Sequence, residues 1–358
     1  MNNAERCFSP DYITARRRFG EAVTARDGRL DSLNVSAKGP AGEDLAIDIG
    51  WFGASNPRYV LVHSSGLHGV EAFAGSAIQL QWLEEGVAML PENAAVVLVH
   101  ALNPYGMAWL RRFNEKNVDL NRNFRDSIDE NAIVPSHWQE VDAFLNPPTP
   151  PSEDHFYLRA AWLVMRYGLP RLKQAVAGGQ HLNPKGLFFS GHTMEEGPAK
   201  FQAFLAKRLA DAKRIVAIDV HTGLGRFGQD RLLVDAAPER HTVNRTMFGA
   251  YGKRVQRLNG DSVAYPVRGA QHDMYYRLFP NAEIYFATQE FGTYHPLRVV
   301  KALREENRWH LYGTGGIAHL SKKALVEAFN PKDPKWRTAV LRRGDEVIRQ
   351  GLQLAFAP

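Results

Sequence analysis

The sequence has only one cysteine, Cys7, among its 358 residues. One thiol cannot form a disulfide within the chain, and it cannot supply the several cysteines that structural zinc sites usually use. The opening segment MNNAERCFSPDYITARRRF has no apolar stretch of the kind found in a secretory signal. We therefore expect a cytoplasmic protein.

Long hydrophobic runs and concentrated charge are also scarce. No stretch approaches the roughly 18 consecutive apolar residues of a membrane-spanning helix, so we expect no membrane partner. The net charge is +6, but the basic residues are scattered apart from short runs at 16–18 and 342–343. Such runs are typical of solvated helix faces, and we expect no nucleic-acid partner. A positive field would instead favour anionic substrates such as free carboxylates.

Short apolar runs rich in β-branched residues predict the strands of a buried sheet. They lie near residues 44, 58, 94, 213, 231 and 282. Segments with helical spacing occur at 70–86, 195–212, 295–309 and 336–356. Because strands and helices alternate, the sequence predicts an α/β sheet covered on both faces. We expect a single domain spanning 1–358, with a helical insertion around 127–212.

The segment HSSGLHGVEAFAGSA places His68 and Glu71 directly after a predicted strand, where a helix begins. An imidazole and a carboxylate three residues apart can bind one cation, a ligand pair that zinc accepts. The carboxyl ends of strands are also where open α/β sheets assemble their ligand sites. The alternative interpretation is an ordinary surface pair.

The same spacing occurs twice more, at His137 with Glu140 and at His192 with Glu195. Both pairs fall in the predicted helical insertion and lack a preceding strand, so we interpret them as surface coincidences. A further histidine, His221, ends the hydrophobic run KRIVAIDVHTGLG and is followed by glycine. Three protein ligands with one position left for water are the pattern of catalytic zinc.

The loop RRFNEKNVDLNRNF concentrates polar residues after another predicted strand, and it contains Arg112, Asp119, Asn121 and Arg122. Arginine offers a planar set of donors that matches a carboxylate, and asparagine adds another donor. This composition indicates an anion-binding wall, although an ordinary capped loop has a similar composition.

A single glutamate, Glu290, lies at the end of the apolar segment YFATQEF. A carboxylate in such a place is costly unless it is exposed or acts in a cleft. The alternative is that it caps the helix that begins near His295.

In this order along the chain, these elements resemble the zinc carboxypeptidase superfamily, which also includes aspartoacylases and succinylglutamate desuccinylases. The segments NPYGMAWLRRFNEKNVDLNRNF, DVHTGLG and EFGTY are more similar still to a bacterial branch catalogued as a domain of unknown function. The similarity extends over most of the chain. It implies a single mixed, mostly parallel, twisted sheet with helices on both faces.

The resemblance also implies roles for individual residues. His68, Glu71 and His221 would bind one zinc ion, although this ligand set also accepts other first-row divalent ions. Glu290 would be the general base, and Arg112 would stabilise the oxyanion.

Three residues of the polar loop would complete the site by the same resemblance. Asn121 and Arg122 would hold the substrate's carboxylate, and Asp119 would orient His68. The substrate-capping tyrosine of the digestive carboxypeptidases has no clear counterpart, and four candidates stay open: Tyr265, Tyr275, Tyr276 and Tyr294.

The resemblance predicts a zinc-dependent hydrolase that cleaves an amide bond next to a free carboxylate, in a small molecule or a short peptide. The segment DVHTG is more similar to the acylase branch, so an N-acyl amino acid deacylase is an alternative. The rival from another class is a non-catalytic zinc-binding relative.

Overall fold

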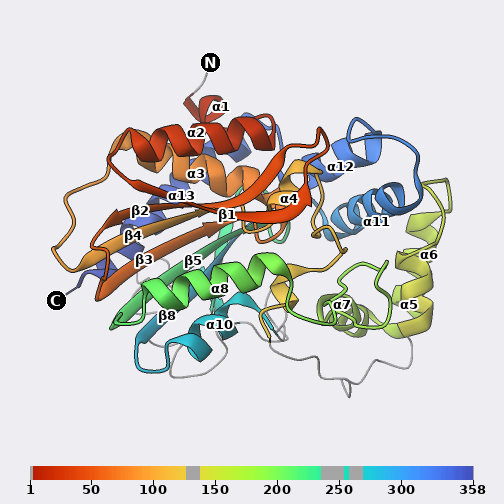
Figure 1. Ribbon diagram of the computed structural model, residues 1–358. Coiled ribbons are helices and arrows are strands. Elements are labelled where there is room, and N and C mark those ends of the chain that lie inside the picture. Colours follow the sequence, from red (N-terminus) through yellow and green to blue (C-terminus); the bar gives the residue numbers. More distant parts are fainter. Residues whose placement is uncertain (1–2, 126–137, 235–253, 258–268, 358) are drawn as a thin grey trace.

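The computed structural model describes residues 3–125, 138–234, 254–257 and 269–357 (Figure 1). Eight strands form one sheet: β1 (Arg29–Lys38), β2 (Asp44–Gly53), β3 (Tyr59–Ser65), β4 (Ala94–His100), β5 (Arg214–Thr222), β6 (Asp230–Val234), β7 (Val255–Arg257) and β8 (Glu283–Phe291). Their spatial order is β1-β2-β4-β3-β5-β8-β6-β7. The four central strands β4, β3, β5 and β8 are parallel to one another. The pairs β1–β2, β2–β4 and β6–β8 are antiparallel, and the edge strand β7 is parallel to β6.

The helices divide into sheet-covering and peripheral sets. The sheet-covering helices are α2 (Tyr12–Thr24), α3 (Ala72–Glu85), α8 (Glu196–Arg208), α10 (Gln271–Leu278) and α13 (Pro334–Ala355), and the short helix α1 (Asn3–Cys7) packs against α3 and α13. The others are α4 (Pro104–Ala108), α5 (Trp138–Leu145), α6 (Phe156–Tyr167), α7 (Leu169–Ala177), α11 (Pro296–Tyr312), α12 (Leu320–Phe329) and the short 3-10 helices η1 (Gly69–Glu71) and η2 (Leu120–Arg122). None of the helices within the described ranges is long and apolar enough to cross a membrane.

Each central strand contributes apolar side chains to both faces of the sheet. In β5, Val216 and Ile218 join the core beneath α2, α3 and α13, whereas Ile215 and Ala217 join the core beneath α8 and α10. Successive residues of a strand point to opposite faces, so a strand covered on both sides is apolar throughout. Figure 1 shows the sheet between these two helical layers. The predicted α/β fold, with one mixed sheet covered on both faces, is confirmed.

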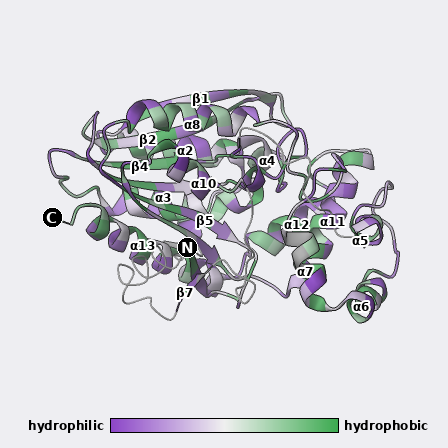
Figure 2. Cartoon of the chain, turned by 90° about the horizontal axis from the view of Figure 1, so that it is seen from below, coloured by the Kyte–Doolittle hydropathy of each residue, from purple (hydrophilic) through white to green (hydrophobic). Residues whose placement is uncertain are grey.

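The remaining helices gather at one end of the molecule, beyond the carboxyl ends of the parallel strands (Figures 1 and 2). Helices α5, α6, α7, α11 and α12 share a third apolar cluster, which also contains Val70, Phe113 and Phe188. This cluster therefore borders the loops that carry the predicted site residues. Within the predicted insertion 127–212, α8 packs on the sheet and α5 to α7 do not. The domain boundaries stay predictions.

Candidate metal centre

The first two predicted ligands lie where β3 turns into α3. The strand ends at Ser65, His68 precedes η1, and Glu71 is the last residue before α3. The turn depends on Gly66, which has a φ of +72°; a Cβ atom at this position would lie only 2.6 Å from the Cβ of Ala72. Glycine alone enters this conformation and this space without strain. The turn brings both side chains to the carboxyl edge of the sheet.

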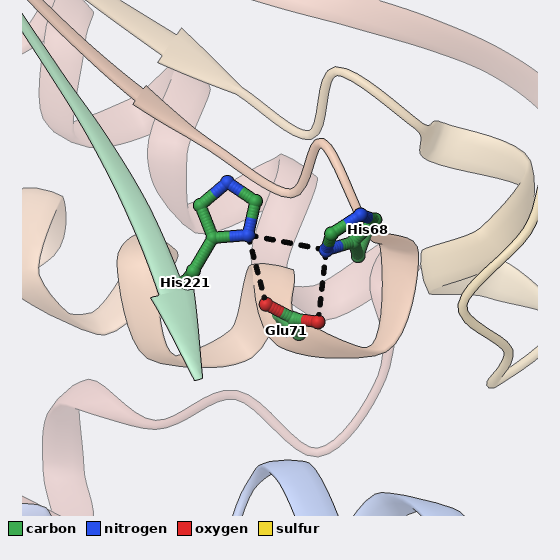
Figure 3. A group of neighbouring side chains, drawn as sticks. All are labelled: His68, Glu71 and His221. Atoms are coloured by element: carbon green, nitrogen blue, oxygen red, sulfur yellow. Dashed lines mark hydrogen bonds and ion pairs between the residues drawn. The ribbon is translucent and has the colours of Figure 1, made fainter. Parts of the chain in front are cut away.

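The third predicted ligand, His221, comes to the same edge from β5, the parallel neighbour of β3. His68 Nδ1 lies 3.1 Å from His221 Nδ1 and 3.0 Å from Glu71 Oε1. His221 Nδ1 lies 3.3 Å from Glu71 Oε2. Figure 3 shows the two rings and the carboxylate converging on one point. Within the part of the chain that the structure describes, these three form the one group with ligand atoms close enough to hold a metal ion.

The opposite ring nitrogens face aspartates. His68 Nε2 lies 3.0 Å from Asp119 Oδ1, and His221 Nε2 lies 2.5 Å from Asp219 Oδ2. When His221 Nε2 carries the proton and donates it to Asp219, its Nδ1 presents a lone pair toward the point that His68 Nδ1 and Glu71 also face. Histidines that bind metals are usually held by carboxylates in this way. Two imidazoles and one carboxylate directed at one point therefore fit a zinc ion.

The charge around these ligands also favours a cation. Burial alone lowers the pKa of His221, but the carboxylates of Asp219 and Glu71 raise it well above its usual value. Burial raises the pKa of Glu71, and the neighbouring His68 and His221 more than reverse this effect, so Glu71 is an anion. A buried cluster that stabilises both an anion and added positive charge is suited to a divalent ion.

Arg112 contacts three members of the cluster. Its Nη1 donates to Glu71 Oε1 at 3.0 Å, its Nε donates to Asp119 Oδ2 at 3.2 Å, and its Nη2 lies 2.7 Å from His68 Nε2. Arg122 Nη1 donates to the same oxygen of Asp119. Although burial raises the pKa of Asp119, the charges of Arg122 and Arg112 hold it well below its usual value. The structure thus brings both predicted arginines to the metal group.

Asn121 lies one step further away. Its backbone N–H donates to Asp119 Oδ1 at 3.2 Å, and its side-chain oxygen accepts from the backbone N–H of Gln271 at 3.3 Å. Its position links the polar loop to the start of α10. The predicted contact of Asn121 with a substrate carboxylate stays a prediction.

Glu290 lies on β8, where it pairs in register with His221 of the adjacent strand β5. The carboxyl group is buried, and it accepts a hydrogen bond of 2.9 Å from the backbone N–H of Leu224. Burial, followed by the negative charge of Glu71, raises the pKa of Glu290 to about 7. A carboxyl group with a pKa near neutrality can both accept and return a proton at physiological pH.

The sequence matches a protein family over residues 8–343, and the family is described as "Protein of unknown function (DUF2817)". The chain belongs to the DUF2817 family. No curated protein matches this DUF2817 chain.

Solved structures similar to this DUF2817 protein include bovine thrombin-activatable fibrinolysis inhibitor in complex with a tick carboxypeptidase inhibitor. The two chains are 12% identical, the match covers 94% of this chain and 98% of the other, and the TM-score is 0.47. Succinylglutamate desuccinylase from Chromobacterium violaceum is 14% identical, with coverage of 87% and 77% and a TM-score of 0.39. An aspartoacylase family protein from Mesorhizobium loti is 13% identical, with coverage of 79% and 67% and a TM-score of 0.37.

The His192–Glu195 pair of this DUF2817 protein is not part of the metal group. The ring of His192 packs on Phe189, and Glu195 accepts from Asn114 and pairs with Lys116. His137 lies outside the described residues.

Three of the four candidate capping tyrosines lie in the described part of the chain. Tyr265 lies outside the described residues, Tyr275 is a fully buried residue of α10, and Tyr294 donates to Glu327 at 2.5 Å. Tyr276 follows Tyr275 on the same helix and its ring lies near His272. The capping role stays unassigned.

One residue of the DUF2817 site, Asp219, is missing from the sequence-based prediction. It lies two residues before His221, and residues i and i+2 of a strand point to the same face, so their spacing alone could have indicated the contact. Ser64 Oγ donates to its second oxygen at 2.6 Å and fixes the carboxylate in place.

Proposed function

We propose that this protein is a zinc-dependent hydrolase that cleaves an amide bond next to a free carboxylate. The observation that carries the proposal is the convergence of His68, Glu71 and His221 on one point, with the carboxyl group of Glu290 on the neighbouring strand. Zinc in such a site supplies Lewis acidity and makes water nucleophilic near neutral pH.

Glu290 is the general base in this proposal. Its carboxylate takes a proton from the attacking water and returns it to the nitrogen of the leaving amine. Burial and the negative charge of Glu71 raise the pKa of Glu290 above that of an ordinary carboxyl group, which favours its action as a general base.

The two arginines act on different groups of the substrate in this proposal. Arg112, already beside Glu71, stabilises the negative charge that develops on the carbonyl oxygen. Arg122 and Asn121 hold the free carboxylate and so determine which amide bond reaches the site. Substrates without a carboxylate should therefore react poorly.

The low exposure of the arginines favours small substrates. Their side chains are only 12% and 6% exposed for Arg112 and Arg122. This supports N-acyl amino acid deacylation as a second candidate, because a small acyl amino acid needs less access than a peptide does.

Metal analysis combined with an activity screen tests the proposal. The purified protein should contain about one zinc ion per chain. It should hydrolyse N-acyl amino acids or short peptides more rapidly than the matching carboxamides. A chelator should abolish this activity, and added zinc should restore it. Stoichiometric zinc without hydrolysis of any substrate in the screen would instead support a non-catalytic zinc-binding protein.

A further inference from the structure

The ring of Phe188 lies against both arginines of the candidate site. Its centroid is 5.7 Å from Arg112 Cζ and 5.3 Å from Arg122 Cζ. The ring also packs edge-to-face on Phe113, with centroids 6.3 Å apart. It is 7% exposed. Phe188 therefore occupies the space directly beside the groups that the proposed function assigns to the substrate.

The backbone holds Phe188 in an unusual conformation. Its φ angle is +60°, in the left-handed region that bulky side chains rarely enter. Its carbonyl accepts from the backbone N–H of Gln180 at 3.0 Å, and the next carbonyl, that of Phe189, accepts from Asp119 at 2.7 Å. Strained residues of this kind persist where the surrounding contacts fix them, and they concentrate at functional sites.

Gly179, near the other end of the same loop, also packs closely against Arg122. A Cβ atom at Gly179 would lie 2.4 Å from Arg122 Cδ, so the backbone approaches the arginine more closely than any side chain would permit. The loop from Gly179 to Ser190 is thus fixed against the arginines at two points. Phe188 has little room to move aside for a larger ligand.

We propose that Phe188 determines substrate specificity by limiting the size of the side chain next to the substrate's carboxylate. This inference rests on the proposed function. A carboxylate held by two parallel hydrogen bonds lies roughly 4 Å from the guanidinium carbon. Because the ring centroid is 5.3 Å from the same carbon, a side chain that leaves this carboxylate on the Phe188 side of the guanidinium meets the ring. The substrate class is carboxylates with small neighbouring side chains, such as N-acyl derivatives of glycine and alanine.

The competing explanation is that the ring only stabilises the arginines through cation–π contacts. The two explanations predict different results when the ring is removed. A size limit makes the effect depend on the substrate, because only large side chains gain from the space. Loss of cation–π contacts weakens the binding of all carboxylates alike.

The test uses the zinc-loaded full chain and four substrates: N-acetylglycine, N-acetylalanine, N-acetylleucine and N-acetyltryptophan. Phe188→Gly removes the ring and suits the positive φ angle, and Phe188→Leu is a second variant that retains more of the packing. Phe189→Leu is the matched control, since Phe189 is an adjacent buried phenylalanine in the core beneath α8 and α10. Thermal melting confirms that each variant is folded.

We expect the wild-type protein and the control to favour the glycine and alanine derivatives. Phe188→Gly should raise kcat/KM for the tryptophan derivative relative to the glycine derivative at least tenfold, mainly through KM, and Phe188→Leu should give an intermediate change. An unchanged ratio, or an equal loss for all four substrates, would overturn the inference.

Binding measurements keep the inference testable if no substrate is hydrolysed, a result that would count against the proposed function instead. Calorimetric titration of the same four compounds should then show that Phe188→Gly raises the affinity for the tryptophan derivative relative to the glycine derivative at least tenfold. The same affinity ratio in wild type and variant would overturn the role of Phe188.

Discussion

The side chains of two adjacent arginines, Arg111 and Arg112, belong to two different buried polar clusters. The side chain of Arg112 enters the candidate metal centre. That of Arg111 is fully buried on the other side of the loop, where its Nε lies 3.5 Å from Glu306 and its Nη2 donates to Asn117 and Asn307. Lys322 from α12 donates to the same oxygen of Glu306. We call the group of Arg111, Glu306, Lys322 and His310 the Arg111 cluster.

The two clusters differ in how their charges balance. In the Arg111 cluster two cations share one carboxylate. In the metal centre two arginines face several carboxyl groups, and the ring nitrogens of two histidines add further lone pairs; the carboxyl groups are Glu71, Asp119, Asp219 and Glu290. Ligand atoms that converge on one point favour a bound cation, whereas the Arg111 cluster is a structural contact between α11, α12 and the loop. Burial and polarity alone do not separate the two.

The largest effect should come from Glu290→Gln. Removing the proposed base should lower kcat by about 10²–10⁴-fold while the zinc content stays unchanged, because Glu290 is not among the three candidate metal ligands. Steady-state kinetics with metal analysis measures both. Glu283→Gln is the control, since Glu283 lies at the opposite, exposed end of β8. Undiminished turnover in Glu290→Gln would remove this residue from the mechanism.

Glu306→Gln tests the structural assignment of the Arg111 cluster. It leaves Arg111 and Lys322 buried without their carboxylate, and breaking a buried ion pair from one side costs about 3–5 kcal/mol. Urea unfolding should show this loss of stability, and zinc content in the folded protein should stay at the wild-type level. Loss of zinc at full stability would mean that the two clusters are not separate in function.

Asp219→Asn should have a smaller effect that is confined to the metal. An asparagine side chain accepts a hydrogen bond from the imidazole N–H less strongly than a carboxylate does, so His221 becomes a weaker ligand. Losing such a carboxylate typically lowers metal affinity 10–100-fold. Competition with a chromophoric chelator measures the affinity, and Asp211→Asn, an exposed change just before β5, is the control. Equal affinities for the Asp219→Asn variant and wild type would contradict the orienting role.

The sequence predicts some strands and site residues of this protein and not others. The difference depends on how far each feature is determined by tertiary contacts. Strands buried on both faces were predicted because they are apolar throughout. The edge strand β1 was not, since it pairs only with β2 and its alternate residues are exposed. His68 and His221 were found through strand ends. By contrast, nothing in the segment LRRF distinguishes Arg111 from Arg112, and only the packing of α11 and α12 decides which one is structural.

The contact of Phe188 with the two arginines likewise cannot be predicted from the sequence. Its segment GLFF is apolar and predicts a core element, yet a positive φ angle turns the ring toward two arginines that precede it in the chain by 66 and 76 positions. Local spacing cannot predict a contact that depends on loop packing between distant segments.

The smallest effect concerns His310, the histidine of the Arg111 cluster. Its Nε2 lies 3.4 Å from the hydroxyl of Tyr105, and its Nδ1 lies 3.4 Å from Lys322 Nζ. Burial, together with the charges of Arg111 and Lys322, lowers the pKa of His310 to about 2. Folded His310 therefore stays neutral at pH 5, unlike a histidine in the unfolded chain.

The resulting pH dependence has a definite sign. Below about pH 6.5 the unfolded chain binds a proton at His310 that the folded protein does not, so the free energy of unfolding falls as the pH falls. Between pH 7 and pH 5 this histidine should account for a loss of about 1–2 kcal/mol. Urea unfolding of wild type and His310→Gln at both pH values measures it. The variant should lose less stability than wild type on acidification, and equal losses would show that His310 takes up its proton in the folded protein.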